Sequence, residues 1–285
     1  MTQGGAGWSG RLGYGCWRWR DLDLIRARGL VERAVEAGMT LVDTADVYGL
    51  PGGSGHAEEL LGAVLAEAPD LRARLAVVTK GGIRPGVPYD SGRRQLVTAC
   101  EASLRRLRTE TIDLYLVHRP DLLAHPQEVA TALSELRAAG KVREVGISNY
   151  SAGQARALLA HLDCPLAAVQ IEFSVLHLDP LDDGVLDLCL ERGITPMAWS
   201  PLAGGKLVDG GRGELTRQLD LLSEAHATNP AAIALAFLMA HPAGVVPLVG
   251  TTDVRRLGAC AEALGVRLGK ADWYALLAAT GRALP

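Results

Sequence analysis

Residues 38–49 read GMTLVDTADVYG, and the fold prediction starts from this stretch. Gly38 suits the end of a preceding helix, and the apolar, β-branched run at 40–42 suits a short buried strand. Asp43 and Tyr48 then follow at the C-terminal end of that strand, where α/β barrels keep their chemistry. A carboxylate and a phenol there suggest acid–base work on a substrate oxygen. The alternative is a capping aspartate and an ordinary loop tyrosine.

Short apolar runs alternate with longer amphipathic runs along the whole chain. The expected strands are residues 12–16, 40–43, 75–79, 112–117, 142–147, 168–171, 194–199 and 245–249. The expected helices are residues 22–37, 57–66, 93–107, 126–139, 151–159, 181–191, 215–226 with 230–240, 254–264 and 272–280. Asn229 and Pro230 suit the N-cap and the first helical position of the 230–240 run.

Eight strand–helix units predict a (β/α)8 TIM barrel that forms a single domain over residues 1–285. A doubly wound sheet is the alternative, but it usually carries a Gly-rich fingerprint after its first strand. Here the first strand is followed by WRWR. The glycine- and proline-rich stretches 51–55, 81–92 and 203–213 are expected to be loops at the catalytic face.

Composition narrows the classes of function. The chain has 285 residues, 48% of them hydrophobic, and a formal net charge of −3, so we expect neither a nucleic-acid nor a membrane partner. Arg105, Arg106 and Arg108 fall at a predicted helix end, where they offset the helix dipole. Five scattered cysteines without a CxxC pair argue against disulfides and zinc. Reduced thiols, no signal-peptide core and no spanning segment predict a cytoplasmic protein.

Polar side chains collect where the predicted strands end. Asp43, Lys80 and His118 end the second, third and fourth strands, and Tyr48 follows in a loop. The later strands end in the pairs Ser148 and Asn149, Gln170 and Glu172, and Trp199 and Ser200. Any one of these residues alone could simply be a solvated loop residue, and His118 alone could be a buried histidine with its hydrogen bonds satisfied. A carboxylate, a phenol, an amine and an imidazole on one face indicate a reaction centre.

These four groups suit the reduction of a carbonyl. The oxygen of the carbonyl gains negative charge and needs a proton, but a free tyrosine with a pKa of about 10 is a poor acid. An ammonium such as that of Lys80 stabilises the phenolate of Tyr48 and eases proton release. Asp43 keeps the ammonium charged and in place, and a neutral His118 orients the carbonyl. Alcohol oxidation would use the same groups in reverse.

The motifs GMTLVDTADVYG, VVTKGG, LYLVHRPD, VREVGISNYS, AAVQIEFSVLH, MAWSPLAGGKL and PLVGTTDVRRL resemble, in this order, those of the aldo-keto reductase family. The resemblance runs from about residue 15 to residue 264, and the HRPD and AWSPLAGGKL forms are most similar to a bacterial single-barrel branch. It implies a (β/α)8 barrel that reduces an aldehyde or ketone with NADPH, with NADH also possible.

The resemblance also implies roles for individual residues. Tyr48 would be the proton donor, Lys80 would tune it, Asp43 would pair with Lys80, and His118 would orient the carbonyl. The nicotinamide would contact Ser148, Asn149, Gln170 and Trp199. The pyrophosphate would follow Ser200, Leu202, Gly204 and Lys206. The 2′-phosphate end of the adenosine would lie at Gly250, Thr251, Thr252 and Arg256, and an arginine fork suits a phosphate well.

Three features depart from the family pattern. The segment before the first strand is short, so the usual N-terminal hairpin is expected to be missing or abbreviated. Asp253 places a carboxylate near the expected 2′-phosphate, which predicts a narrower preference for NADPH over NADH. Ala259 and Cys260 stand where many relatives have Glu and Asn, which predicts a weaker hold on adenine.

The substrate pocket is expected to be lined by Trp17, Trp19 and Tyr89, because these residues follow the first and third strands. Ordinary loop packing is the alternative for all three. A tryptophan-walled pocket would favour flat or apolar aldehydes. We expect a monomer, since no interface stripe stands out. A nucleotide-sensing regulator on the same barrel and a metal-dependent barrel enzyme are the competing classes, but the strand ends offer one histidine and no carboxylate–imidazole cluster.

Overall fold

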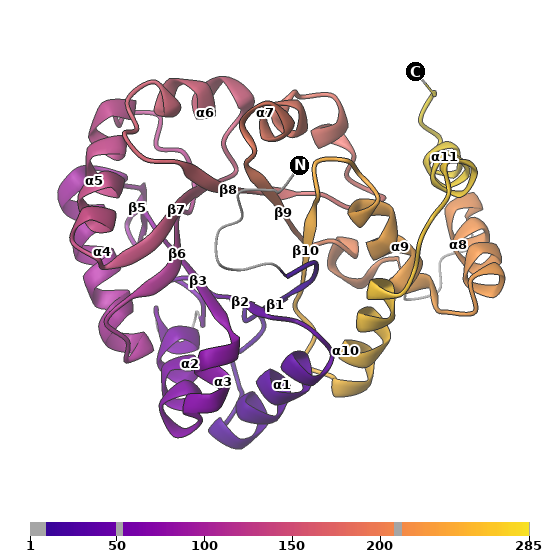
Figure 1. Ribbon diagram of the computed structural model, residues 1–285, viewed down its shortest axis with the longest axis horizontal. Helices are drawn as coiled ribbons and strands as arrows, with labels where there is room; N and C mark the ends of the chain where they lie inside the picture. The colour runs from indigo at the N-terminus through magenta and orange to yellow at the C-terminus, as the bar shows by residue number, and fades with distance from the viewer. Residues whose placement is uncertain (1–9, 50–53, 208–212, 285) are drawn as a thin grey trace.

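The computed structural model describes residues 10–49, 54–207 and 213–284. Within these ranges, eight parallel strands close into a barrel in the order β1-β10-β9-β8-β7-β6-β3-β2, with the helices outside it (Figure 1). This is the (β/α)8 barrel that the sequence predicts. The barrel strands are β1 Gly13–Gly15, β2 Leu41–Asp43, β3 Ala76–Gly81, β6 Ile112–Val117, β7 Val142–Ser148, β8 Leu166–Glu172, β9 Thr195–Trp199 and β10 Val246–Val249.

The described helices follow the predicted runs closely, because caps as well as periodicity mark their ends. They are α1 Leu24–Glu36, α2 His56–Glu67, α3 Pro69–Arg74, α4 Arg93–Leu107, α5 Pro126–Ala138, α6 Ala152–Leu159, α7 Val185–Arg192, α8 Glu214–Ala225, α9 Pro230–Met239, α10 Val254–Ala261 and α11 Lys270–Ala279. As predicted, Asn229 caps α9, with Pro230 as its first residue. Gly38 follows α1 with a φ of 85°, which suits glycine. None of these helices is long and apolar enough to cross a bilayer.

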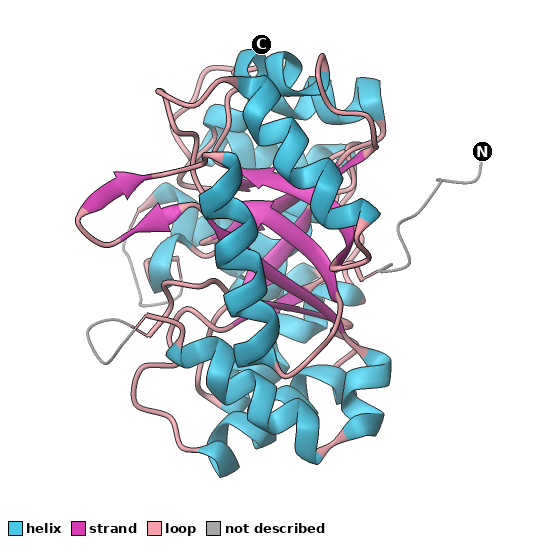
Figure 2. Ribbon diagram, turned by 90° about the vertical axis from the view of Figure 1, so that its left-hand side faces the viewer, coloured by secondary structure: helices cyan, strands magenta, loops and turns pink. Residues whose placement is uncertain are grey.

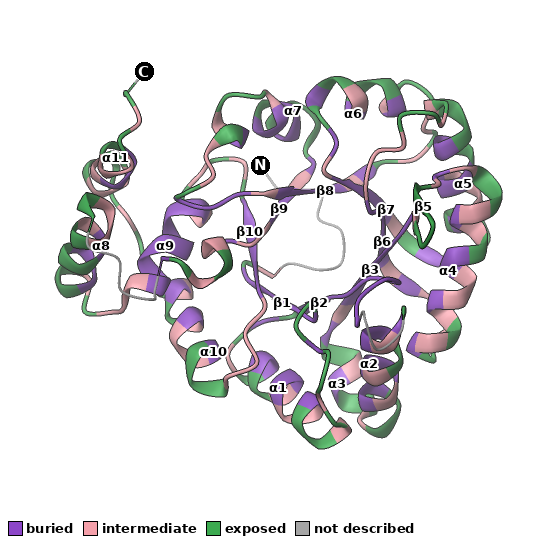
Figure 3. Cartoon of the chain, turned by 180° about the vertical axis from the view of Figure 1, so that it is seen from behind, coloured by how far each residue is buried: buried purple, intermediate pink, exposed green. Residues whose placement is uncertain are grey.

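The barrel strands are buried on both faces (Figure 3). Leu41, Val78, Leu116, Ala168 and Met197 pack into a small apolar cluster with Leu114 and Leu248. The intervening residues of the strands pack in a second, larger cluster with the helices. Because side chains on a strand alternate with a period of two, the residues two positions beyond the small cluster point to the same side, at the strands' C-terminal ends.

Two features depart from the sequence prediction, a hairpin and a short helix. Residues 81–92, expected to be a loop, contain an antiparallel hairpin of β4 Ile83–Arg84 and β5 Val87–Tyr89 that projects from the barrel (Figure 2). The short helix α3 follows α2 directly, and Pro69 starts it. Helices α8 and α11 lie side by side outside the ring, beyond α9 (Figure 1). The predicted N-terminal abbreviation concerns residues 1–9, which lie outside the described residues.

Candidate active site

The polar residues predicted at the strand ends form the next layer above the apolar barrel cluster. Asp43, Lys80, His118, Gln170 and Trp199 each lie two residues beyond a member of that cluster. The apolar layer lies below them. Asp43, His118, Gln170 and Trp199 line one groove at the C-terminal ends of the strands, and the buried Lys80 is bonded to Asp43. The sequence prediction that they converge is confirmed by this packing.

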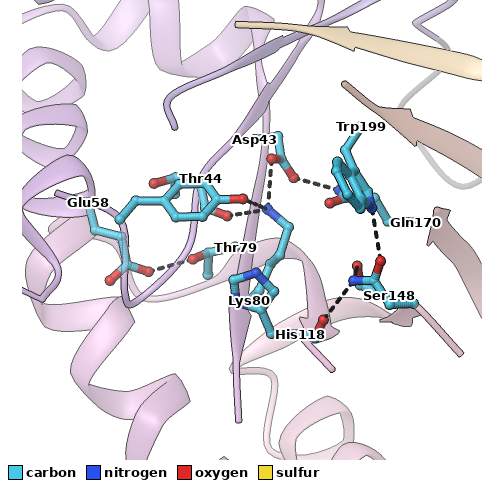
Figure 4. Close-up of polar contacts among 11 residues, drawn as sticks. Asp43, Thr44, Glu58, Thr79, Lys80, His118, Ser148, Gln170 and Trp199 are labelled. Carbon is cyan, nitrogen blue, oxygen red and sulfur yellow. Dashed lines mark hydrogen bonds and ion pairs between the residues drawn. The ribbon is translucent and has the colours of Figure 1, made fainter. Parts of the chain in front are cut away.

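Lys80 is the centre of the polar contacts, and its side chain is wholly buried. Its Nζ donates to Asp43 Oδ2 at 2.7 Å, to the Thr44 carbonyl oxygen at 2.8 Å and to the Tyr48 hydroxyl at 3.1 Å (Figure 4). An ammonium has three protons, and all three have acceptors here. Burial disfavours the charged form, but Asp43 and Tyr48 outweigh it and raise the pKa of Lys80. The ammonium is therefore charged and fixed.

The buried carboxylate of Asp43 is bonded on both oxygens. Oδ2 accepts from Lys80, and Oδ1 accepts from Gln170 Nε2 at 2.8 Å (Figure 4). Gln170 is thereby oriented with its amide nitrogen toward Asp43, and its carbonyl oxygen is left for a ligand. The same carboxylate thus neutralises the buried ammonium and orients a residue predicted to hold the nicotinamide.

Tyr48 and His118 stand beside Lys80, with their ring centroids 5.8 Å apart. Burial raises the pKa of Tyr48 above its ordinary value, and Lys80 opposes this only in part. The predicted easing of proton release is therefore present but smaller than the effect of burial, and the phenol stays protonated near neutrality. Burial, Lys80 and Arg119 hold the pKa of His118 well below its usual range, so the ring is neutral.

A groove of about 1030 Å³ runs from these residues across the barrel mouth to the start of α10. Most of the residues predicted to hold the cofactor line it. These are Ser148, Asn149, Gln170, Trp199, Ser200, Leu202, Gly204, Gly250, Thr251, Thr252 and Arg256. Ala259 and Cys260, expected near adenine, line it too. Lys206 is exposed and is not a lining residue, although its neighbours Gly205 and Leu207 are, so its place along the pyrophosphate stays a prediction.

Asn149 makes hydrogen bonds to three residues that line the groove. Its Nδ2 donates to the His118 carbonyl oxygen at 3.2 Å and to Ser148 Oγ at 2.8 Å, and its Oδ1 accepts from Trp199 Nε1 at 2.9 Å. Its φ of 63° is uncommon for a non-glycine residue, and Ser200 shares this feature with a φ of 50°. Strained backbone of this kind collects at functional sites. Asn149 therefore fixes the Trp199 ring instead of pointing a free amide into the groove.

At the far end, Asp253 caps helix α10. Its Oδ1 accepts from the backbone N–H of Arg255 at 2.8 Å and of Arg256 at 3.4 Å, and its Oδ2 contacts Arg255 Nη2 at 3.4 Å. These hydrogen bonds, those to the Arg255 backbone first, hold the pKa of Asp253 below its ordinary value. The carboxylate is thus turned to the helix end and to Arg255. Among the described residues, the Arg256 side chain has no ion-pair partner.

Of the three residues predicted to line the substrate pocket, only Trp17 does so. Its ring meets Tyr48 edge-on with centroids 5.0 Å apart. Trp19 is wholly buried, because the turn after β1 folds its indole back to donate to the Tyr14 hydroxyl at 3.0 Å. Tyr89 is exposed on the projecting hairpin and is absent from the groove lining. The predictions for Trp19 and Tyr89 are wrong.

Two arginines in the groove escaped the sequence reasoning. Arg18 donates to the Gly250 carbonyl oxygen at 3.2 Å and to that of Gly204 at 3.3 Å, so it bridges the loops after β9 and β10. Arg119 lies with its guanidinium carbon 5.7 Å from the Trp199 ring centroid. Each lies two residues after the end of a predicted strand, at positions 18 and 119, and a charged residue there was the available signal.

The closed barrel and its acid–base groove define a class of barrel enzyme, and comparison with known proteins gives the family. The aldo/keto reductase family profile matches residues 11–279. The chain is 44% identical over 282 residues to 6-dehydroglucose reductase of Novosphingobium aromaticivorans, covering 96% of this chain and 93% of that protein. The protein therefore belongs to the aldo/keto reductase family and is an oxidoreductase.

Solved structures of the same family share the whole architecture. The thermostable aldo-keto reductase Tm1743, solved with the inhibitor epalrestat, superposes with a TM-score of 0.84 at 27% identity over 98% of each chain. An aldo-keto reductase of Klebsiella pneumoniae in complex with NADPH gives a TM-score of 0.79 at 28% identity, over 93% of this chain and 89% of that one.

Proposed function

We propose that the protein reduces an aldehyde or ketone to an alcohol with NADPH, reversibly, and that Tyr48 gives the proton to the carbonyl oxygen. The contact from Lys80 Nζ to the Tyr48 hydroxyl at 3.1 Å carries this proposal. Because the phenol oxygen accepts that bond, its own O–H hydrogen points away from Lys80 and is free for a substrate. When the proton has left, the fixed ammonium balances the phenolate charge.

The groove suits a dinucleotide phosphate in both length and chemistry. It begins at a neutral imidazole and amide groups and passes the glycine-rich backbone after β9. It ends at two threonines and at Arg256, which has no ion-pair partner in the described part of the chain. The Ser148 hydroxyl and the Gln170 carbonyl oxygen would hold the carboxamide, and Trp199 would lie against the ring. Arg256 would face the 2′-phosphate. Bound NADPH supplies the hydride, and the protein orients the carbonyl that receives it.

His118 orients the substrate. A neutral histidine can donate one hydrogen bond to a carbonyl oxygen without giving up its proton, which leaves proton transfer to Tyr48. Among the described residues, the buried Nδ1 of His118 has no hydrogen-bond partner, so the ring is free of competing contacts. Trp17 packs against Tyr48 in a T-shaped arrangement and forms the wall of the groove beside it.

For the substrate, we propose a hydroxylated aldehyde instead of a flat apolar one. Of the described tryptophans, Trp17 and Trp199 line the groove near Tyr48, and Arg119 lies over the Trp199 ring with donors for hydroxyl oxygens. The 44% identical relative is named a 6-dehydroglucose reductase, which agrees with a sugar aldehyde. The apolar wall expected from three aromatic residues is reduced by the burial of Trp19 and the outward position of Tyr89.

The test follows the loss of NADPH absorbance with 6-dehydroglucose, glyceraldehyde and benzaldehyde. We expect turnover with all three and the highest kcat/KM with the sugar aldehyde. A higher kcat/KM for benzaldehyde would refute the substrate class but leave carbonyl reduction standing. Tight NADPH binding without turnover of any carbonyl would instead support a nucleotide-sensing regulator.

A further inference from the structure

A buried ion pair lies behind Lys80, outside the barrel, and the proposed reaction does not use it directly. Glu58, in the first turn of α2, is wholly buried and contacts Arg106 of α4. Its Oε2 lies 2.7 Å from Arg106 Nε and 2.6 Å from Arg106 Nη2. The sequence prediction assigned Arg106 to the dipole of its own helix, but the structure shows it bound to a different helix. A buried ion pair is weak as a source of stability, so its position needs another explanation.

The second oxygen of Glu58 reaches the strand that carries Lys80. The hydroxyl of Thr79 donates to Glu58 Oε1 at 2.5 Å, as Figure 4 shows. Thr79 is wholly buried and faces α2, because neighbouring side chains on a strand point to opposite sides and Lys80 points into the barrel. Arg106 occupies the other oxygen, so the carboxylate cannot turn away from Thr79.

The same turn of α2 also holds Tyr48. The N–H of Ala57 donates to the Tyr48 carbonyl oxygen at 3.3 Å, and Ala57 directly precedes Glu58. A closed ring of contacts results. Two of its links are peptide bonds, Ala57–Glu58 and Thr79–Lys80. The other three are hydrogen bonds, which join Ala57 to Tyr48, Thr79 to Glu58, and Lys80 Nζ to the Tyr48 hydroxyl. We call these five residues the α2 bracket.

The close approach of α2 and α4 gives the bracket a fixed base. A Cβ on Gly62 of α2 would lie 2.2 Å from the Arg106 carbonyl oxygen, so only glycine permits this packing. The opposite side of Lys80 is tied as well, since the Asp46 N–H donates to the Lys80 carbonyl oxygen at 3.1 Å. Helix α2 is thus packed closely against α4, and it contacts the backbone of Tyr48 through Ala57 and the strand of Lys80 through Glu58.

We propose that Glu58 and Thr79 are positioning residues that set the separation of Lys80 Nζ from the Tyr48 hydroxyl. This rests on the proposed role of Tyr48 as proton donor. A displacement of about 1 Å at a reacting group can cost roughly 10²-fold in rate. The bracket acts on kcat because it fixes two groups that meet at the reacting oxygen. It lies apart from the part of the groove that we assign to the cofactor.

The test is Thr79→Val, which keeps the shape of a β-branched residue and removes the hydroxyl. We expect kcat to fall about 10- to 100-fold with KM and the NADPH Kd within about twofold of the parent. Thr79→Ser, which keeps the hydroxyl, should restore kcat to within about threefold of the parent. Ser103→Ala is the matched control, because Ser103 is equally buried and accepts from Arg106 Nη2 at 3.3 Å but, among the described residues, has no side-chain hydrogen bond to β3. It should leave kcat unchanged.

A merely structural role would lower the Tm of Thr79→Val and leave kcat at the parent value, and that result would overturn the proposal. If Thr79→Val does not fold, Thr79→Ser and Thr79→Ala are compared in its place, since both lose the methyl group and only alanine loses the hydroxyl. Equal kcat in that pair would overturn the proposal as well. A parent protein that turns over no carbonyl would refute the proposed function, which is a different outcome.

Discussion

The two ends of the groove hold their charges in different ways. At the catalytic end, the Lys80 ammonium is buried and every one of its protons has a fixed acceptor. At the far end, Arg256 is exposed and its side chain has no ion-pair partner among the described residues. A fixed charge gives a group its geometry and its pKa before any ligand arrives. A free charge adapts to a ligand and contributes affinity instead. We call the region around Lys80 the fixed end of the groove and the region around Arg256 the free end. We therefore expect substitutions at the fixed end to change kcat and substitutions at the free end to change the Kd of the cofactor.

The largest effect is expected for Tyr48→Phe, which removes the proton donor at the fixed end and also one of the three acceptors of Lys80 Nζ. Loss of a positioned acid costs about 10²–10⁴-fold, and we expect at least that loss in kcat. Fluorescence titration should give an unchanged NADPH Kd. A variant that reduces aldehydes at the parent rate would show that the proton comes from another group.

Lys80→Met should also be nearly inactive, and it should lose stability. Removal of the ammonium leaves Asp43 as a buried charge without its partner, a change that typically costs about 3–5 kcal/mol. We expect a lower free energy of unfolding in urea and a kcat at least 100-fold below the parent. Activity within a few-fold of the parent would contradict the proposed roles of Asp43 and Lys80 in the reaction at Tyr48.

The fixed end also contains a group that weakens the fold at neutral pH. Burial and then the neighbouring Glu58 raise the pKa of Asp46 to about 7, against the smaller effects of Arg106 and Lys80. The folded state therefore holds this proton more tightly than the unfolded state. The stability that it contributes is present at about pH 4 and is lost as the pH rises to about 7.

Asp46→Asn removes this titration. We expect the variant to match the parent at about pH 4 and to exceed its unfolding free energy by about 2–4 kcal/mol at pH 8. Urea unfolding of both proteins across this range measures the difference. A constant difference at every pH would mean that Asp46 does not titrate between these limits.

The smallest effect is expected at the free end. Arg256→Ala should raise the NADPH Kd about 10-fold and leave the NADH Kd almost unchanged, since only NADPH carries the 2′-phosphate. Asp253→Asn sharpens this result, because asparagine caps a helix as well as aspartate does but carries no charge. It should tighten NADPH alone by a few-fold. An equal rise in the Kd of NADPH and NADH in Arg256→Ala would show that this arginine does not bind the 2′-phosphate.

The residues of the fixed end could be predicted from the sequence, because they lie at the C-terminal ends of barrel strands and the alternation of side chains along a strand determines their direction. Strand periodicity and strand ends put Asp43, Lys80 and His118 in one layer, and the observed strand β6 coincides with the predicted run 112–117. The direction of a side chain in a loop follows no such rule. Trp19 turns inward because Tyr14 offers it a hydrogen-bond acceptor, a contact that only the folded barrel creates.

The same limit explains the other misplaced residues. The hairpin β4–β5 carries Tyr89 away from the groove, and its turn was read only as a glycine-rich loop. Asp253 was expected to place its carboxylate near the 2′-phosphate, but the N-terminus of α10 offers this carboxylate two backbone donors. Arg106 was assigned to its own helix, although its partner lies 48 positions earlier in the chain. The contact of Arg106 joins distant segments, whereas the hairpin and the Asp253 cap are local arrangements whose geometry the sequence pattern alone did not specify.

The most direct measurement of the division between the two ends is a single-turnover experiment at saturating NADPH, with the rate of hydride transfer followed by stopped-flow absorbance. We predict that Arg256→Ala reacts at the parent rate once NADPH is saturating, because its only loss is affinity. Tyr48→Phe, fully loaded with NADPH, should react at least 100-fold more slowly, because it lacks the proton donor. A slow Arg256→Ala variant at saturation, or a fast Tyr48→Phe variant, would contradict the separation of chemistry from cofactor affinity.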